Sequence, residues 1–386
     1  MYSLLQIVYY SICNIIDILK SPLFWIVLGI IYLQYRKVGE MEKGILGVHK
    51  KSPTLNVILS TMYGLAGGII GSILIIYFGI TIRAVDVYFI LPLAILLSLI
   101  HPRFICFSYA GGIISIISLV FGRPNINVSG VMFVIGVLHL VESFLILVDG
   151  KGNRMPIFME KKGEIIGGFT MNRFWPVPFT IFINAGSLYP TTVLAILGYG
   201  DFALSNFPEK KAKDTASILS LYSITLLILA RLSQSYYIFK YIAAIFAPLA
   251  HEIIIRIGRQ MEEKDFIFTP VEEGLRVLDT LPKSIGEKIG LNPGDILISL
   301  NGHRIYSNKD IEDILFFRPN YIWLEVYDIK GGFITKEYKD YKNGVTHLGI
   351  VVVPRVPEQI FMVEESKTII SRLVDRLKGK KSTFKN

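Results

Sequence analysis

Residues 286–302 read GEKIGLNPGDILISLNG, and this stretch carries the most specific structural signal in the chain. Its first residues, Glu287 to Ile289, are predicted to form a short helix that the following glycine ends. Asn292 to Asp295 has the composition of a tight turn. The apolar run from Ile296 to Leu300 then predicts a buried strand, and Asn301-Gly302 is the dipeptide favoured in two-residue hairpins. Together these signals predict a small α+β unit.

The sequence on either side completes this unit. Leu275 and Val277 begin a strand before it, and residues 308–316 suit a helix with apolar positions three or four apart. Two alternating segments, 321–327 and 333–338, are joined through a glycine pair and predict a final hairpin. This order resembles a bacterial PDZ domain, here placed at residues 269–356. The resemblance implies a domain that binds peptides and needs no catalytic residue, metal or cofactor.

One departure from the PDZ pattern concerns the loop that receives a peptide carboxylate. Bacterial protease-type PDZ domains place a Leu-Gly-hydrophobic loop before the first strand, whereas His347-Leu348-Gly349-Ile350 follows the last hairpin here. We therefore expect a permuted strand order, with the loop and its strand at the C-terminal end. The resemblance then assigns peptide binding to Leu348, Gly349, Ile350, Val351, Ile311 and Leu315. The alternatives are an ordinary edge strand for the first four and simple core packing for the two helical residues. Glu273-Gly274-Leu275 is a weaker second candidate for the loop.

The rest of the chain has the composition of a membrane protein. Of its 386 residues 52% are hydrophobic and 18% are charged, and the mean hydropathy is +0.50. This composition excludes disordered, collagenous and disulfide-rich classes. The apolar residues lie mostly before residue 257, in runs that approach the roughly 20 residues needed to cross a bilayer. The predicted spans lie at about 3–18, 22–35, 55–80, 86–100, 104–121, 129–149, 215–231 and 235–256.

Charge predicts how these spans are oriented. The first 256 residues carry 20 Lys+Arg and 12 Asp+Glu, whereas the last 130 carry 20 and 19. Basic residues confined to loops between apolar runs are typical of cytoplasmic loops and do not indicate nucleic-acid binding. The basic loops near residues 36–51, 151–173 and 210–213 all fall on one side only if the Pro-rich stretch 175–207 enters and leaves from the same side. We therefore predict a broken or re-entrant pair of segments there.

The predicted fold class is thus an α-helical polytopic membrane domain followed by a small α+β PDZ domain. Residues 1–256 form the membrane domain with seven or eight spans, and 257–268 form a linker. The PDZ domain follows on the cytoplasmic side, and residues 357–386 form an amphipathic, basic tail. Within the membrane domain, Gly64, Gly67, Gly68 and Gly71 share one helical face, which predicts close approach of another helix. The same face would permit a homo-oligomer.

Ionisable residues inside the predicted spans are candidates for function, because burying them costs free energy. His139 and Glu142 share a helical face and could pair or bind a cation, while His251 and Glu252 lie near the end of the last span. Intramembrane zinc proteases carry H-E-x-x-H, but Ile255 stands where that motif has its second histidine. Structural interhelical roles are the alternative for all four residues. Cys106, like the other cysteine, is interpreted as a small buried apolar residue.

The whole arrangement resembles the MinJ-like cell-division topology proteins. Residues 167–169, Gly-Gly-Phe, and 173–176, Arg-Phe-Trp-Pro, also resemble the central loop of that family. The resemblance implies a non-enzymatic scaffold in the cell membrane, enriched at septum and poles. Its implied partners are membrane lipids and proteins of the DivIVA, MinD and divisome classes. The alternatives are an intramembrane protease or protease regulator that selects substrates with the PDZ domain, and, more weakly, a transporter.

Overall fold

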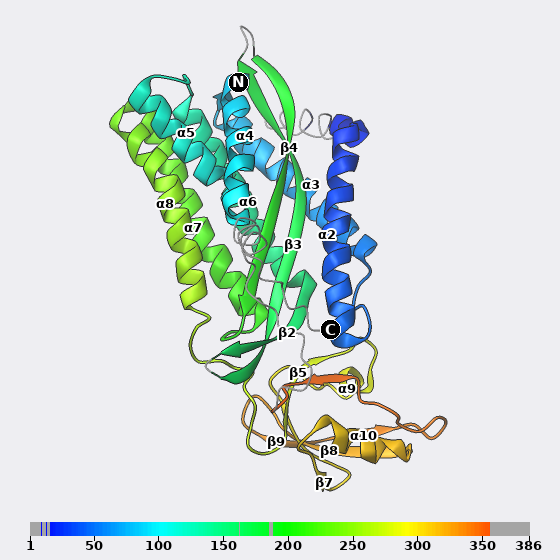
Figure 1. Cartoon of the computed structure of the whole chain (residues 1–386). Coiled ribbons are helices and arrows are strands. Elements are labelled where there is room, and N and C mark those ends of the chain that lie inside the picture. Colours follow the sequence, from blue (N-terminus) through cyan, green and yellow to red (C-terminus); the bar gives the residue numbers. More distant parts are fainter. Residues whose placement is uncertain (1–8, 10–12, 14–15, 162, 185–187, 356–386) are drawn as a thin grey trace, which may run out of the picture.

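The computed structural model describes residues 9, 13, 16–161, 163–184 and 188–355 (Figure 1). A bundle of helices surrounds a long β-hairpin, and a smaller unit of strands and short helices lies at one end of the bundle. Most of the predicted span 3–18 and the predicted tail 357–386 fall outside the described residues. The helices are α2 Pro22–Leu46, α3 Pro53–Tyr77, α4 Ala84–Ile100, α5 Phe107–Phe121, α6 Val128–Asp149, α7 Pro208–Ser235 and α8 Ile238–Gln260.

Local sequence explains where these helices begin. The serine before the first proline of α2 and of α3 accepts a hydrogen bond from a backbone N–H of the first turn. Proline fits the first helical position because it lacks the N–H that would go unpaired there. Gly47 and Gly122 follow α2 and α5 in the left-handed conformation, with φ of 73° and 71°, and so end these helices.

Within the described residues, four helices are long and apolar enough to cross a membrane: α3, α6 with its short 3-10 extension, α7 and α8. Two more apolar helices, α4 and α5, are shorter. Arg83, before α4, donates a hydrogen bond to the backbone oxygen of Asn125, after α5, at 2.6 Å. The short pair therefore starts and ends at the same end of the bundle. Its turn, the 3-10 helix η1 (Pro102–Ile105), lies beside the middle of α6. The sequence had predicted a full span for each member of this pair.

The Pro-rich stretch, predicted as a broken or re-entrant pair of segments, lies in a β-hairpin. Strand β3, Glu164–Asn184, pairs antiparallel with β2, Arg154–Lys161, and with β4, Leu188–Ala203. The two-residue strand β1, Thr81–Ile82, pairs parallel with the far end of β3. The hairpin does bring its two flanking basic loops to one end of the bundle. There Glu209 pairs with both Lys151, at 3.6 Å, and Arg154, at 2.9 Å.

The edge of β3 that faces α3 has its backbone donors satisfied in an alternating pattern. The N–H of Phe174 donates to the Tyr35 hydroxyl at 3.1 Å, and the N–H of Thr180 donates to Ser72 Oγ at 2.8 Å. The two positions between them with the same orientation are Pro176 and Pro178, which have no N–H to satisfy. Prolines on a strand edge without a ladder partner cost no hydrogen bond. The two prolines, which are unfavourable in a straight helix, are therefore well suited to this strand edge.

The glycine face of α3 is shared between this strand and a helix. A Cβ on Gly64 or Gly68 would overlap the carbonyl oxygen of Pro176 or Pro178 in β3. Gly67 and Gly71 instead face Val141 and its neighbours on α6. The expected close approach of a helix thus describes only half of the face, because the other half packs against strand backbone.

The C-terminal unit contains β5 Leu275–Thr280, α9 Ile285–Lys288, β6 Ile296–Leu300, β7 His303–Arg304, α10 Asn308–Phe316, β8 Tyr321–Tyr327, β9 Phe333–Lys339 and β10 Ile350–Val352. These elements lie close to the ranges that the sequence predicts. The sheet order is β10-β5-β6-β8-β9, with β7 beside β6. The last described strand therefore pairs with the first strand of the unit.

The unit is packed against the helical bundle. The N–H of Gly167 in β3 donates to the Phe268 carbonyl at 2.8 Å, and the Phe268 side chain is fully buried. Lys50, between α2 and α3, forms an ion pair with Asp279 of β5. Glu262, in the stretch predicted as a linker, accepts hydrogen bonds from the N–H groups of Leu204 and Ser205. These contacts fix the position of the unit relative to the hairpin.

Replacing Gly68 by leucine should disrupt the contact between α3 and β3. The new side chain would meet the carbonyl of Pro178, and overpacking of this kind costs about 1–3 kcal/mol. The matched control is Gly29→Leu, because a side chain on Gly29 of α2 meets no atom within 4 Å. Thermal unfolding of the full chain in detergent should show a lower Tm for Gly68→Leu only. Equal Tm values for the two variants would contradict this packing.

Candidate functional site

Strand β10 is an edge of the sheet within the described part of the chain. Ile350 lies opposite Thr280 and Val351 lies opposite Asp279, and the Leu281 N–H donates to the Gly349 carbonyl at 2.9 Å. In an antiparallel ladder, residues alternate between hydrogen-bonded and non-hydrogen-bonded pairs. Since Gly349 bonds inward to β5, the N–H and C=O of Ile350 point away from β5. A partner strand would meet these groups first.

The loop before β10 depends on its glycine. Gly349 has φ of 65°, and a Cβ there would overlap the Cβ of Ser284 beside α9. The Leu348 carbonyl accepts a hydrogen bond from the Gly286 N–H at 2.8 Å. The loop is therefore held against the start of α9, and a side chain at position 349 is excluded by both space and conformation.

The structure brings most of the predicted groove residues into one core. Ile311 and Leu315 of α10, together with Leu348, are buried in the apolar cluster of the C-terminal unit, and Ile350 packs against it. Val351 instead packs against the apolar cluster of the helical bundle. The two helical residues are thus part of the core of the C-terminal unit.

The start of α10 is fixed by a reciprocal cap. Ser307 Oγ accepts from the Asp310 N–H at 3.3 Å, and the Asp310 carboxylate accepts from the N–H groups of Tyr306 and Ser307 at 2.7 and 2.8 Å. The hydrogen bond from Tyr306 first, and then that from Ser307, hold the pKa of Asp310 below its usual value. This cap sets where the helix begins relative to the sheet.

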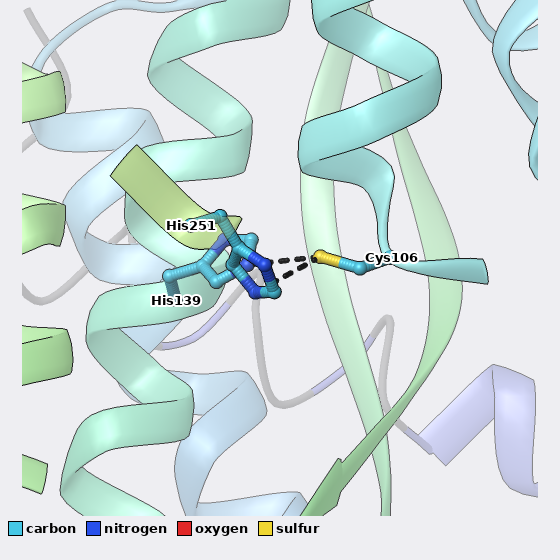
Figure 2. A group of neighbouring side chains, drawn as sticks. All are labelled: Cys106, His139 and His251. Carbon is cyan, nitrogen blue, oxygen red and sulfur yellow. Dashed lines mark hydrogen bonds between the residues drawn. The ribbon is translucent and has the colours of Figure 1, made fainter. Parts of the chain in front are cut away.

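A second candidate site lies inside the helical bundle, where three residues meet (Figure 2). Cys106 comes from the N-terminal cap of α5, His139 from the middle of α6, and His251 from α8. Cys106 Sγ lies 3.1 Å from His139 Nε2 and 3.6 Å from His251 Nε2. His139 is buried and the other two are half-buried. The sequence had grouped Cys106 with inert apolar residues, and its surroundings correct that interpretation.

Both imidazole rings are oriented through their other nitrogen. His139 Nδ1 lies 2.8 Å from the Ile135 carbonyl, so it donates its proton there. His251 Nδ1 lies 3.4 Å from the Tyr109 hydroxyl, which itself donates to Glu252 at 2.9 Å. With Nδ1 protonated, each Nε2 carries a lone pair directed at the sulfur.

The four ionisable residues singled out in the sequence have different surroundings. His139 Nε2 lies 4.0 Å from Glu142 Oε2, so these two residues are neighbours on one face of α6. Glu252 contacts Arg103 at 3.4 Å and Arg256 at 3.3 Å and accepts a hydrogen bond from Tyr109. The spacing of residues along the chain did not reveal that Cys106 meets both histidines. Cys106 is 33 residues from His139 and 145 residues from His251.

A third polar group lies where α6 ends. Asp149 accepts hydrogen bonds from Arg173 Nε at 2.6 Å and from Trp175 Nε1 at 2.8 Å. Arg173 and Trp175 are fully buried in β3, and Asp149 is buried too. Arg173 ends the stretch 151–173 that was predicted as a basic loop, but it lies in β3 and is buried.

No protein-family model matches the chain. The cell division topological determinant MinJ of Bacillus subtilis (strain 168) is 24% identical to it over 201 residues. The chain is similar to MinJ. The match covers 52% of the chain and 49% of that protein, so the chain spans about half the length of the curated relative that it matches. This finding confirms the resemblance to MinJ-like cell division proteins, and the four apolar helices fit a membrane protein.

Replacing Asp149 by alanine should destabilise the bundle strongly. The change leaves the buried guanidinium of Arg173 without its partner, and removing one member of a buried ion pair costs about 3–5 kcal/mol. The control is Asp17→Ala, which breaks the exposed pair with Lys20 and should cost at most about 1 kcal/mol. Denaturant unfolding in detergent compares the two variants. A small effect for Asp149→Ala would show that the buried network does not stabilise the fold.

Proposed function

We propose that this protein is a non-enzymatic membrane scaffold that presents a PDZ-like unit to protein partners in division-site placement. The observation that carries the proposal is the similarity to MinJ, whose name gives it a role in cell division topology. The C-terminal unit, in which β10 is an edge strand among the described residues, supports a binding role. The partners that we propose by resemblance are proteins of the DivIVA, MinD and divisome classes.

The proposed binding mode is addition of a partner strand to β10. An extended peptide would pair with the outward N–H and C=O of Ile350, and the loop Leu348-Gly349 would receive its end. Edge strands recruit other chains because their backbone groups are unpaired. The cap of α10 and the glycine of the loop support this mode, since both fix the backbone that surrounds the edge.

The proposed orientation places the C-terminal unit in the cytoplasm, next to the lipid surface. The ion pairs of Glu209 with Lys151 and Arg154 support it, because they put two basic loops at one end of the bundle. The C-terminal unit lies at that same end (Figure 1). Basic loops favour the cytoplasmic side. We retain a multi-pass membrane domain, with α4 and α5 as a short pair that enters and leaves from the opposite side.

The protease alternative is less well supported than the scaffold proposal, because its sequence motif is incomplete. The helix α8 carries His251-Glu252, yet Ile255 occupies the position of the second histidine, and Glu252 is engaged by Tyr109 and two arginines. These contacts occupy the carboxylate that a general base would need. The scaffold proposal therefore stands ahead of a protease.

The variant Ile350→Pro tests the binding mode in the full chain. It removes the outward N–H of β10 without removing an inward ladder bond, so septal enrichment of a fluorescent fusion and capture of division proteins should be lost. Ile350→Val is the matched control, because it keeps the N–H and should behave as the parent does.

Two results would count against the proposal. Uniform membrane fluorescence of the parent fusion in dividing cells, with normal septum placement after deletion, would remove the division role. Parent-like capture by Ile350→Pro, with unchanged Tm, would remove β10 as the binding edge and leave the division role open.

A further inference from the structure

The cluster of Cys106, His139 and His251 has the composition of a transition-metal site. The three ligand atoms lie within 4.8 Å of one another, and Figure 2 shows both rings facing the sulfur. We propose that these three residues bind a zinc ion inside the helical bundle. This inference does not depend on the division role.

The distances between the ligand atoms agree with tetrahedral zinc. Zinc binds thiolate sulfur at about 2.3 Å and imidazole nitrogen at about 2.0–2.1 Å, so sulfur and nitrogen in a tetrahedral site are about 3.5 Å apart. The two separations here are 3.1 Å and 3.6 Å. Small rotations of the side chains would therefore admit the ion without movement of the helices.

The second contacts of both histidines also suit a metal site. Imidazoles that bind metals usually donate their other N–H to a carbonyl or carboxylate, which fixes the ring and its tautomer. His139 donates to the Ile135 carbonyl, and His251 Nδ1 lies beside the Tyr109 hydroxyl, which leads to Glu252. Each Nε2 then faces the sulfur, and His139 Nε2 also lies 3.3 Å from the Ser108 hydroxyl, which the ion would displace.

Glu142 lies next to the three ligands without belonging to their group. Its carboxylate oxygen lies 4.0 Å from His139 Nε2, on the same face of α6. A thiolate and two imidazoles form a donor set that zinc accepts, whereas blue copper sites pair the same three ligands with a weak thioether. The neighbouring carboxylate, in place of a thioether, therefore favours zinc.

Such an ion would join three parts of the bundle that are separate in sequence. It would connect the turn between α4 and α5 to α6 and to α8, the helix that leads into the C-terminal unit. A structural zinc stabilises the folded state because the unfolded chain does not hold its ligands together. The ion would then fix α8 relative to the rest of the bundle.

The first experiment measures metal in the full chain, purified in detergent without chelator. The parent should hold about one zinc ion per chain, and Cys106→Ser, His139→Ala and His251→Ala should each lose it. Cys13→Ser and His303→Ala are matched controls that keep their zinc, because neither residue belongs to the cluster. Parent protein without zinc after incubation with the ion, or zinc retained by Cys106→Ser, would overturn the proposal.

A second measurement remains informative where a variant fails to fold. In the Cys13→Ser chain Cys106 is the sole thiol, so zinc should slow its alkylation and a chelator should restore the rate. Cobalt in place of zinc should add a thiolate-to-metal absorption band. Alkylation that zinc does not slow would overturn the proposal, and so would exclusive binding of copper.

The role of Tyr109 gives a graded test. Tyr109→Phe removes the acceptor of His251 Nδ1, and loss of such a contact weakens metal binding about 10–100-fold. Tyr241→Phe is the control, because Tyr241 bonds to the Leu119 carbonyl elsewhere in the bundle. Competition with a zinc indicator compares the two affinities. Equal affinities would show that Tyr109 does not position His251.

Discussion

The long strand β3 must satisfy its backbone on the edge that faces α3, and the bundle is arranged around this requirement. An unpaired backbone N–H inside an apolar bundle costs several kcal/mol. Two side-chain hydroxyls, from Tyr35 and Ser72, accept the donors at the two ends of this edge, and prolines at 176 and 178 remove the two between. The carbonyls of those prolines lie against glycines of α3, where no side chain intervenes.

This edge determines what the rest of the bundle can do. Strand β3 lies against α3, and its residues Arg173 and Trp175 donate hydrogen bonds to Asp149. These hydrogen bonds fix the end of α6. The near end of β3 carries Gly167, whose N–H holds Phe268 and with it the C-terminal unit. The same helix α6 presents His139 to the turn before α5 and to α8. The proposed binding edge and the proposed metal site are therefore both positioned by one strand.

Much of the fold followed from local patterns. Helix boundaries lie near Ser-Pro and glycine signals, and the strands of the C-terminal unit fall where alternating apolar residues and the turn Asn292 to Asp295 placed them. The position of β10 was also readable, because the Leu-Gly-Ile sequence stood after the last hairpin. The hairpin β3–β4 was missed because its prolines and glycines argue only against a helix. They do not predict that the stretch forms a strand with an edge against α3.

The sequence by itself determined an apolar helical half and a small α+β unit, because hydropathy and turn chemistry act over a few neighbouring residues. Only the tertiary structure decided which polar residues share a site. Cys106, His139 and His251 come from segments far apart in the chain, and Asp149 meets Arg173 through the fold of a hairpin. Such contacts depend on how helices and strands pack in three dimensions. The periodicity of one segment carries no information about which other segment will lie beside it.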